Sequence, residues 1–279
     1  MVVMRTMMGM KACLLVAVLM LCSCGAGMVP LKPYLVQDVK TIEVAQIEAG
    51  NSLLVRRVNP LFLAMGSSGL MADAVVVANH AFRYEQHAGP VHQMCVTLFE
   101  KTLLQALAAQ GFQANSSNKR FWDYFKGSQK SLRESTDGLL HIRLQQMGFW
   151  SKAVDDGYFP SLMVVVEMID PVSREVLYSD RFSMGIDLTS VKVMDVANGY
   201  SNILPLGQEF LPYENFNDLL EHADESRDDL LRVVSRAARY ISQSLRRPKV
   251  VPMEAGAPML IKSMPDMPSS TRIDAYTLK

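Results

Sequence analysis

The chain has 279 residues, and its 28 basic and 28 acidic side chains give a formal net charge of zero at pH 7. Nucleic-acid-binding domains carry a basic excess, so this balance gives no indication of such a partner. Hydrophobic residues make up 49% of the sequence, enough for one sizeable core with insertions or for two small domains.

The first 23 residues have the layout of a secretory signal peptide. Arg5 and Lys11 supply positive charge, and an uninterrupted apolar stretch runs from Ala12 to Leu21. This stretch is too short to cross a bilayer, which takes roughly 20 apolar residues. Several methionines among the first ten residues offer alternative starts, and none of them changes this prediction.

The apolar stretch ends in Leu21-Cys22-Ser23-Cys24, in which leucine stands three residues before Cys24 and two small residues lie between. This resembles the lipobox of bacterial lipoproteins. The resemblance implies cleavage between Ser23 and Cys24 and acylation of Cys24 as the first mature residue. Cys22 is a poorer acceptor, because bulky Leu21 would stand at the small position before the cut. The alternatives are ordinary signal cleavage without lipid and a cysteine of no significance.

The resemblance further implies two or three acyl chains on Cys24, and two or more chains hold a protein stably on a membrane. Gly25 stands where an acidic residue commonly retains lipoproteins in the inner membrane of enteric bacteria. We therefore expect a lipid-anchored protein on the periplasmic face of the outer membrane, with no cofactor besides the covalent lipid. Cys95 would be the only other cysteine of the mature chain, which excludes an internal disulfide.

A lipidated N-terminus and tether over 24–38 leads into two predicted strands. Residues 39–47 alternate between apolar and polar side chains with one slip of register, which is typical of a half-buried strand. A second short apolar run covers 53–58 and ends at Asn59-Pro60, a turn signal.

The segment from Leu61 to Ala78 contains a single charge, Asp73, and has Gly66-Ser-Ser-Gly69 in its middle. Its length would permit a transmembrane helix, but Asp73 would cost about 2.5 to 3.5 kcal/mol near the bilayer centre. We therefore expect a buried or partly buried hairpin-like insertion over 59–90, broken at the glycines. The alternative is a contact with a partner or with the membrane surface, made by Leu61, Phe62, Gly66, Gly69 and Leu70.

The clearest helix of the first half runs from Val91 to Gln110, with its apolar residues along one arc. Cys95 lies near the middle of this arc, and we expect it to be a small buried hydrophobe. Three histidines are near enough in sequence to be considered as metal ligands with it: His80, His87 and His92. This set lacks a second ligand pair at fixed spacing, so we expect no metal.

Two segments between 115 and 145 predict further parts of the core. Residues 115–131 are polar apart from an aromatic group that we expect to form a flap over the core: Phe121, Trp122, Tyr124 and Phe125. Residues 140–145 alternate strictly, which predicts a half-buried strand with His141 facing outward. Arg143 shares that outer face, where an anion site is the alternative to an ordinary solvated strand.

The strongest β signal is a hairpin. Residues 162–169 and 176–184 flank the turn signal Asp170-Pro171, and another turn is expected at Asp155-Asp156-Gly157. Residues 162–166 are apolar on both faces, which is typical of a central strand covered on both sides.

The C-terminal part predicts two helices after an irregular insertion over 185–215. Asn217 would cap a short helix, and Ser226 with Asp229 has the pattern of a capping box for a longer one. The longer helix has one apolar face and one arginine-rich face. We expect it to pack on a sheet, and a helix lying on anionic lipid is the alternative. We expect the proline-rich tail over 248–279 to be disordered.

This order of elements predicts an α+β two-layer sandwich over 39–247, with a mostly antiparallel sheet and two main helices on one face. Together with the lipobox it resembles small envelope lipoproteins, namely the lipopolysaccharide-assembly lipoprotein, the auxiliary lipoproteins of ABC-type lipid transport and the lipoprotein of curli secretion. The resemblance is carried by the lipobox, the helix from Val91 to Gly111 and the hairpin MVVVEMIDPVSREVLYSD at 163–180. The insertions at 59–90 and 185–215 depart from that pattern.

The sequence contains no catalytic pattern. Gly66-Ser-Ser-Gly69 has the wrong spacing for a serine-hydrolase elbow, and no phosphate-binding loop is found. Asp155-Asp156 and Asp228-Asp229 are better explained by a turn and a helix N-terminus. We therefore expect a membrane-anchored, non-catalytic scaffold or accessory subunit of a cell-envelope assembly or transport complex. The alternative is a periplasmic lipid- or glycan-binding module.

Overall fold

The computed structural model describes residues 39–57, 59–126, 136–151, 157–185 and 202–245. The predicted signal peptide, Cys24 and the tether lie outside these ranges. So do the C-terminal tail, Asp155-Asp156 and most of the predicted insertion at 185–215.

Three long antiparallel strands form the centre of the sheet: β5 Gly138–Ser151, β6 Phe159–Ile169 and β7 Val176–Met184. The predicted hairpin is confirmed in β6 and β7. Its turn is closed by Asp170, whose Oδ1 accepts hydrogen bonds from the backbone N–H groups of Val172 and Ser173. Leu162 to Val166 are all buried, as predicted for a central strand.

Shorter strands pair in parallel at both sides of this centre. β1 Thr41–Val44, β2 Glu48–Ala49 and β3 Leu54–Arg57 follow one another along β5. β4 Gln113–Ser116 pairs with β1, and β8 Asn202–Leu204 pairs with β7. The described sheet therefore has the order β4-β1-β5-β6-β7-β8, with β2 and β3 also on the β1 side of β5.

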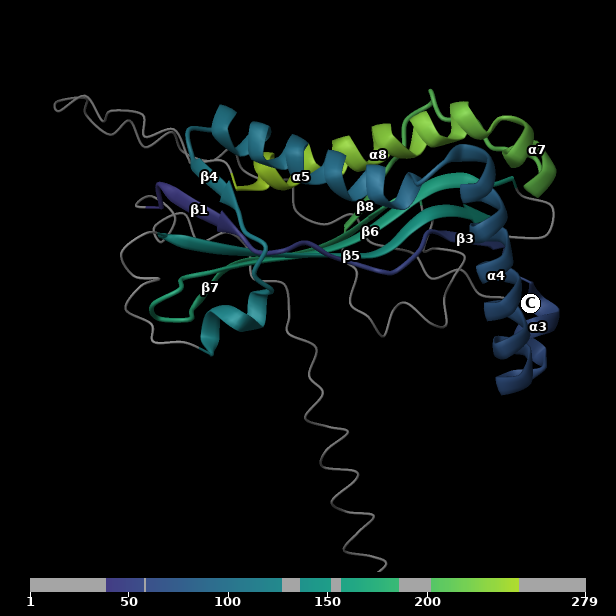
Figure 1. Ribbon diagram of the computed structural model, residues 1–279, viewed down its shortest axis with the longest axis horizontal. Coiled ribbons are helices and arrows are strands. Elements are labelled where there is room, and N and C mark those ends of the chain that lie inside the picture. Colours follow the sequence, from purple (N-terminus) through teal and green to yellow (C-terminus); the bar gives the residue numbers. More distant parts are fainter. Residues whose placement is uncertain (1–38, 58, 127–135, 152–156, 186–201, 246–279) are drawn as a thin grey trace, which may run out of the picture. The chain divides into compact units, whose positions relative to one another are not determined.

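The helices of the described residues are α3 Pro60–Ala64, α4 Gly66–Ala88, α5 Val91–Ala109, α7 Phe216–Glu221 and α8 Ala223–Ser244, with a 3-10 helix η1 Phe121–Phe125. α5 and α8 lie side by side over one face of the sheet (Figure 1). The main core between these layers includes Phe99, Leu103, Ile142, Val164, Val234 and Ile241. The α+β fold with two main helices on one face of a mostly antiparallel sheet is confirmed.

A second, smaller core lies on the other face of the sheet, beneath η1. Phe121 and Tyr124 are buried there, as expected of a flap, whereas Trp122 is exposed. The prediction that His141 faces solvent is wrong, because this flap covers it. The His141 ring is 3% exposed and stacks on Phe121 with 4.1 Å between ring centroids.

Both predicted helix caps are also wrong by a few residues. Asn215, and not Asn217, caps α7, because its side-chain oxygen accepts hydrogen bonds from the N–H groups of Asn217 and Asp218. Ser226 lies inside α8, which begins at Ala223 directly after α7. Its hydroxyl is buried and lies 2.8 Å from the Tyr84 hydroxyl oxygen, so this serine joins two helices.

This cap can be tested by substitution. We expect Asn215→Ala to lower the free energy of unfolding by about 1 kcal/mol, because two backbone N–H groups at the start of α7 lose their acceptor. Asn217→Ala is the matched control and is expected to change stability by less than about 0.5 kcal/mol. Urea denaturation followed by circular dichroism measures the stability of both variants. Equal losses of stability would contradict the assignment of Asn215 as the cap of α7.

Candidate functional site

The apolar segment after β3 forms a pair of helices. α3 is followed by a reversal at Met65 and Gly66, and Gly66 adopts a positive φ of 62° that glycine tolerates best. α4 then continues unbroken past Gly69. A Cβ at Gly69 would lie 1.9 Å from the carbonyl oxygen of Phe62, so glycine is required where α3 crosses α4. The predicted hairpin-like break therefore occurs at Gly66, and the prediction of a break at Gly69 is wrong.

The second half of α4 is fixed to the body of the protein. Ala81, Tyr84 and Ala88 are buried, and the Tyr84 ring meets Phe149 of β5 edge-on at 5.0 Å between centroids. The first half, by contrast, buries only Gly69 and Asp73. It is therefore held to the sheet through few contacts.

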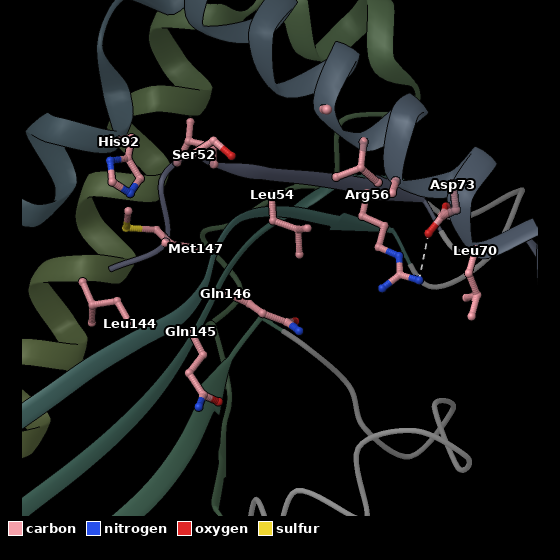
Figure 2. Close-up of a pocket in the computed structure, with 15 residues that line it drawn as sticks. Ser52, Leu54, Arg56, Leu70, Asp73, His92, Leu144, Gln145, Gln146 and Met147 are labelled. Atoms are coloured by element: carbon pink, nitrogen blue, oxygen red, sulfur yellow. Dashed lines mark ion pairs between the residues drawn. The ribbon is translucent and has the colours of Figure 1, made fainter. Parts of the chain in front are cut away.

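One of these contacts is an ion pair between the sheet and the helix. Figure 2 shows Arg56 of β3 directed toward Asp73 of α4, with 2.9 Å between nitrogen and carboxylate oxygen. The Asp73 side chain is 12% exposed and that of Arg56 is 25% exposed. The Arg56 guanidinium also lies over the Trp150 ring, 5.3 Å from its centroid. The charge of Asp73 is thus neutralised at the inner side of α4.

A cavity of about 480 Å³ lies between the first half of α4 and the strands β3 and β5. Its apolar lining includes Leu70, Leu144 and Met147, and Arg56 and Gln146 supply polar groups (Figure 2). The Arg56 Nε and Gln146 Oε1 atoms are buried without a hydrogen-bond partner among the described residues. Ser52, His92 and Gln145 also line the cavity, so its wall combines apolar and polar side chains.

A second cavity, of about 580 Å³, is lined by residues of β3, α3, α4 and α7. His80 stacks on Phe216 there, with 4.0 Å between ring centroids. Burial, with the nearby positive charges of Arg83 and Arg57, lowers the pKa of His80. Asp73 lines both cavities.

The other polar cluster surrounds His141. Its Nε2 lies 3.1 Å from Glu48 and its Nδ1 lies 3.7 Å from Glu167. The neighbouring His141 ring, followed by Arg143 and Arg181, lowers the pKa of Glu167 against the opposing effect of burial. Two carboxylates already flank His141, so the surroundings do not favour the anion site considered from the sequence.

The lowered pKa of Glu167 predicts a pH dependence. Its ionised form contributes stability that is full above the ordinary carboxyl pKa of 4.5 and is lost as pH falls through the lower folded value. We therefore expect wild type to exceed Glu167→Gln in stability at pH 7 and this difference to shrink below about pH 4.5. Urea denaturation at several pH values between 3 and 7 measures it. Glu175→Gln is the control and reports the effect of removing an exposed carboxylate from the same hairpin. A stability difference between wild type and Glu167→Gln that does not vary with pH would contradict the prediction.

The residues considered for a metal site are not brought together. Cys95 is fully buried, as predicted for a small hydrophobe, and burial raises the pKa of its thiol to about 12. The His87 ring contacts the backbone oxygen of Arg83, and His92 lines the first cavity. Among the described residues, no three His, Cys, Asp or Glu side chains form a group that would hold a metal ion.

The contact residues predicted from the sequence divide into two sets. Leu61, Gly66 and Leu70 are exposed, whereas Phe62 is half-buried and Gly69 is buried. Sequence reasoning missed Arg56 and four further exposed apolar residues of α4: Met71, Val75, Val76 and Phe82. The repeat of Met71, Val75, Ala78 and Phe82 at helical spacing was a signal for three of these residues, and the sequence holds no comparable signal for Arg56 or Val76.

No helix within the described ranges combines the length and hydropathy needed to cross a bilayer. No protein-family model matches the chain, and no curated protein matches it in sequence.

Some solved structures resemble the fold in outline. The PelC dodecamer from Paraburkholderia phytofirmans is 11% identical, with a TM-score of 0.35 over 80% of this chain and 96% of that one. A DUF330 protein from Xanthomonas campestris is 10% identical, with a TM-score of 0.34 over 78% and 93%. A lipoprotein from Neisseria meningitidis is 13% identical, with a TM-score of 0.26 over 57% and 99%. Likeness at this level carries no inference about function.

Proposed function

We propose that this protein is a lipoprotein anchored through Cys24 to the periplasmic face of the outer membrane, where it serves as a non-catalytic scaffold or accessory subunit in envelope assembly or transport. The observation that carries the proposal is the sequence Leu21-Cys22-Ser23-Cys24 at the end of a short apolar stretch that follows positive charge. A folded α+β domain then begins at β1, fifteen residues or more beyond the cysteine.

The geometry of the described domain supports a non-catalytic role. A cysteine nucleophile acts as its thiolate, but Cys95 is fully buried and its pKa is raised to about 12. His141 is stacked under the aromatic flap between two carboxylates. Neither group is among the residues that line the two cavities beside α4. The surface instead offers exposed apolar side chains on α3 and α4, which suit contact better than chemistry.

The test compares the intact mass and the membrane fractionation of wild type, Cys24→Ala and the control Cys22→Ala. We expect an acyl-sized increase in mass and outer-membrane fractionation for wild type and for Cys22→Ala, and loss of both for Cys24→Ala. Crosslinking of the wild type in cells is then expected to capture an envelope protein. Unmodified, soluble protein in all three would contradict the anchor, and an acylated protein without any crosslinked partner would contradict the scaffold.

A second candidate is a lipid- or glycan-binding module, which the cavity beside α4 favours. Its wall combines the apolar side chains of Leu70, Val77 and Met147 with polar side chains that include Ser52, His92 and Gln146. Native mass spectrometry of the full chain would show a bound small molecule. We expect Gln146→Leu to lower its occupancy, and spectra free of adducts would dismiss this candidate.

A further inference from the structure

Exposed apolar side chains gather on α3 and α4. Six of the twelve large hydrophobic side chains that are exposed in the described residues belong to these two helices, and Met65 lies between them: the six are Leu61, Leu70, Met71, Val75, Val76 and Phe82. The other five are spread over the rest of the described surface. Single exposed hydrophobes are ordinary, but a contiguous group marks a surface that contacts something.

The most exposed of these side chains form one stripe along α4. Met71, Val75 and Phe82 are 74%, 69% and 62% exposed, and Ala78 completes a series with steps of four, three and four residues. Such steps keep side chains on one face of an α-helix. Asp73 and Tyr84, which face the body of the protein, point away from that stripe. The apolar stripe of α4 is therefore turned outward.

This face carries no formal charge at pH 7. Between Leu61 and Phe82 the only acidic or basic residue besides His80 is Asp73, and Asp73 is buried and paired with Arg56. A charged partner would therefore find no complementary group on the stripe itself. An apolar medium over Met71, Val75 and Ala78 would meet no charge that has to lose its hydration, and the first charges beyond Phe82 are Arg83 and Glu85.

The length of chain before β1 brings a membrane within reach of this face. β1 starts beside Gly138 and β3 ends beside Ser151, so α3 begins one whole length of β5 away from the first strand. At about 3.3 Å per residue, the 14 residues of β5 span about 45 Å. The 14 residues between Cys24 and Val39 span about 45 to 50 Å when extended. A tether of this length allows the domain to lie along the membrane surface.

We propose that the outward apolar stripe of α4 lies in the surface of the lipid bilayer to which Cys24 anchors the chain. This inference rests on the proposed anchor. α4 is not suited to cross the bilayer, so it would lie in the plane of the interface with Met71, Val75 and Phe82 among the acyl chains. Because the stripe is uncharged, the contact depends on apolar burial and needs no anionic lipid.

The test uses the full-length, acylated protein in vesicles of phosphatidylethanolamine and phosphatidylglycerol, with a fluorescent NBD label on Val75→Cys. Cys95 stays unlabelled under native conditions, because it is fully buried and its thiol pKa is raised to about 12. The matched control is Leu211→Cys, which is 73% exposed and shares its surroundings with Glu209, Glu225 and Asp228. We expect a blue-shifted emission at position 75 and at least about twofold quenching by brominated lipids, with neither effect at position 211.

The other outcomes overturn the proposal. A solvent-like emission at position 75 in vesicles would show that the face does not enter lipid. A blue shift without lipid quenching would assign the face to a second copy if it grows with protein concentration, or to another segment of this chain if it does not. The intact mass of the same sample reports acylation, so a missing anchor and a missing lipid contact are told apart. Replacing phosphatidylglycerol with phosphatidylcholine is expected to leave the quenching unchanged, and its loss would mean that charge drives binding.

Discussion

Arg56→Ala is expected to release the first half of α4 from the sheet, because it leaves the carboxylate of Asp73 almost buried and without its cation. Breaking a fully buried ion pair from one side costs about 3 to 5 kcal/mol. Here the two side chains are 25% and 12% exposed, so part of that cost is screened by solvent and about 2 kcal/mol is expected. The contact of the guanidinium with the Trp150 ring is lost as well.

Because this part of α4 buries few side chains, the loss is expected as local opening before global unfolding. Hydrogen exchange measured by mass spectrometry should show faster exchange over 66–78 and unchanged exchange in α5. Asp73→Asn keeps the shape of the side chain and removes the charge, so Arg56→Ala combined with Asp73→Asn is expected to recover part of the protection. If Arg56→Ala leaves exchange over 66–78 unchanged, the ion pair does not hold the helix.

The elements that could be predicted from the sequence are those whose signals are local. The hairpin of β6 and β7 is specified by apolar strands on both sides of Asp170-Pro171, and the Asp170 side chain closes that turn itself. α5 is specified by its own apolar arc, and Gly111 follows it with a positive φ of 88°. The predicted bounds of β7 are confirmed and those of α5 differ by one residue, whereas β6 begins three residues before its predicted start.

The errors arose where a residue depends on another segment. The alternation of apolar and polar residues in β5 shows which side chains share a face of the sheet. It does not show that Phe121, from another segment, packs on His141 and covers it. Ser226 has the residue type of a helix cap, yet its hydroxyl serves Tyr84, 142 residues earlier in the chain. Neither contact produces a periodic pattern in the sequence, so neither contact could be predicted from the sequence.

The segment from Leu61 to Ala78 was ambiguous for a different reason. It is apolar on nearly every side, so composition does not tell which face packs on the protein. In the structure, one small and one polar residue determine which face of α4 packs on the protein. Gly69 leaves room for α3, and Asp73 forms an ion pair with Arg56. The large apolar side chains are left outside, which is the reverse of the usual amphipathic helix.

The second prediction contrasts two aromatic residues of α4 that stand two positions apart. Tyr84→Ala is expected to lower the free energy of unfolding by about 3 to 5 kcal/mol, because the ring is fully buried against Phe149 and its hydroxyl pairs with Ser226. Tyr84→Phe keeps the ring and is expected to cost about 1 kcal/mol. Phe82→Ala, at a position that is 62% exposed, is expected to change stability by less than about 0.5 kcal/mol.

Urea denaturation of the three variants measures these differences, and a cost for Phe82→Ala that approaches that of Tyr84→Ala would show that the outward face is packed within the fold. The expected small effect of Phe82→Ala would instead show that the outward face is not packed within the fold. If Phe82 adds nothing to folding, the sequence keeps a large aromatic side chain in water beside Met71 and Val75 without a gain in stability. Such a group is then explained by what it contacts outside the chain. The same Phe82→Ala variant, carrying the label at position 75, is expected to weaken lipid quenching while leaving the fold intact.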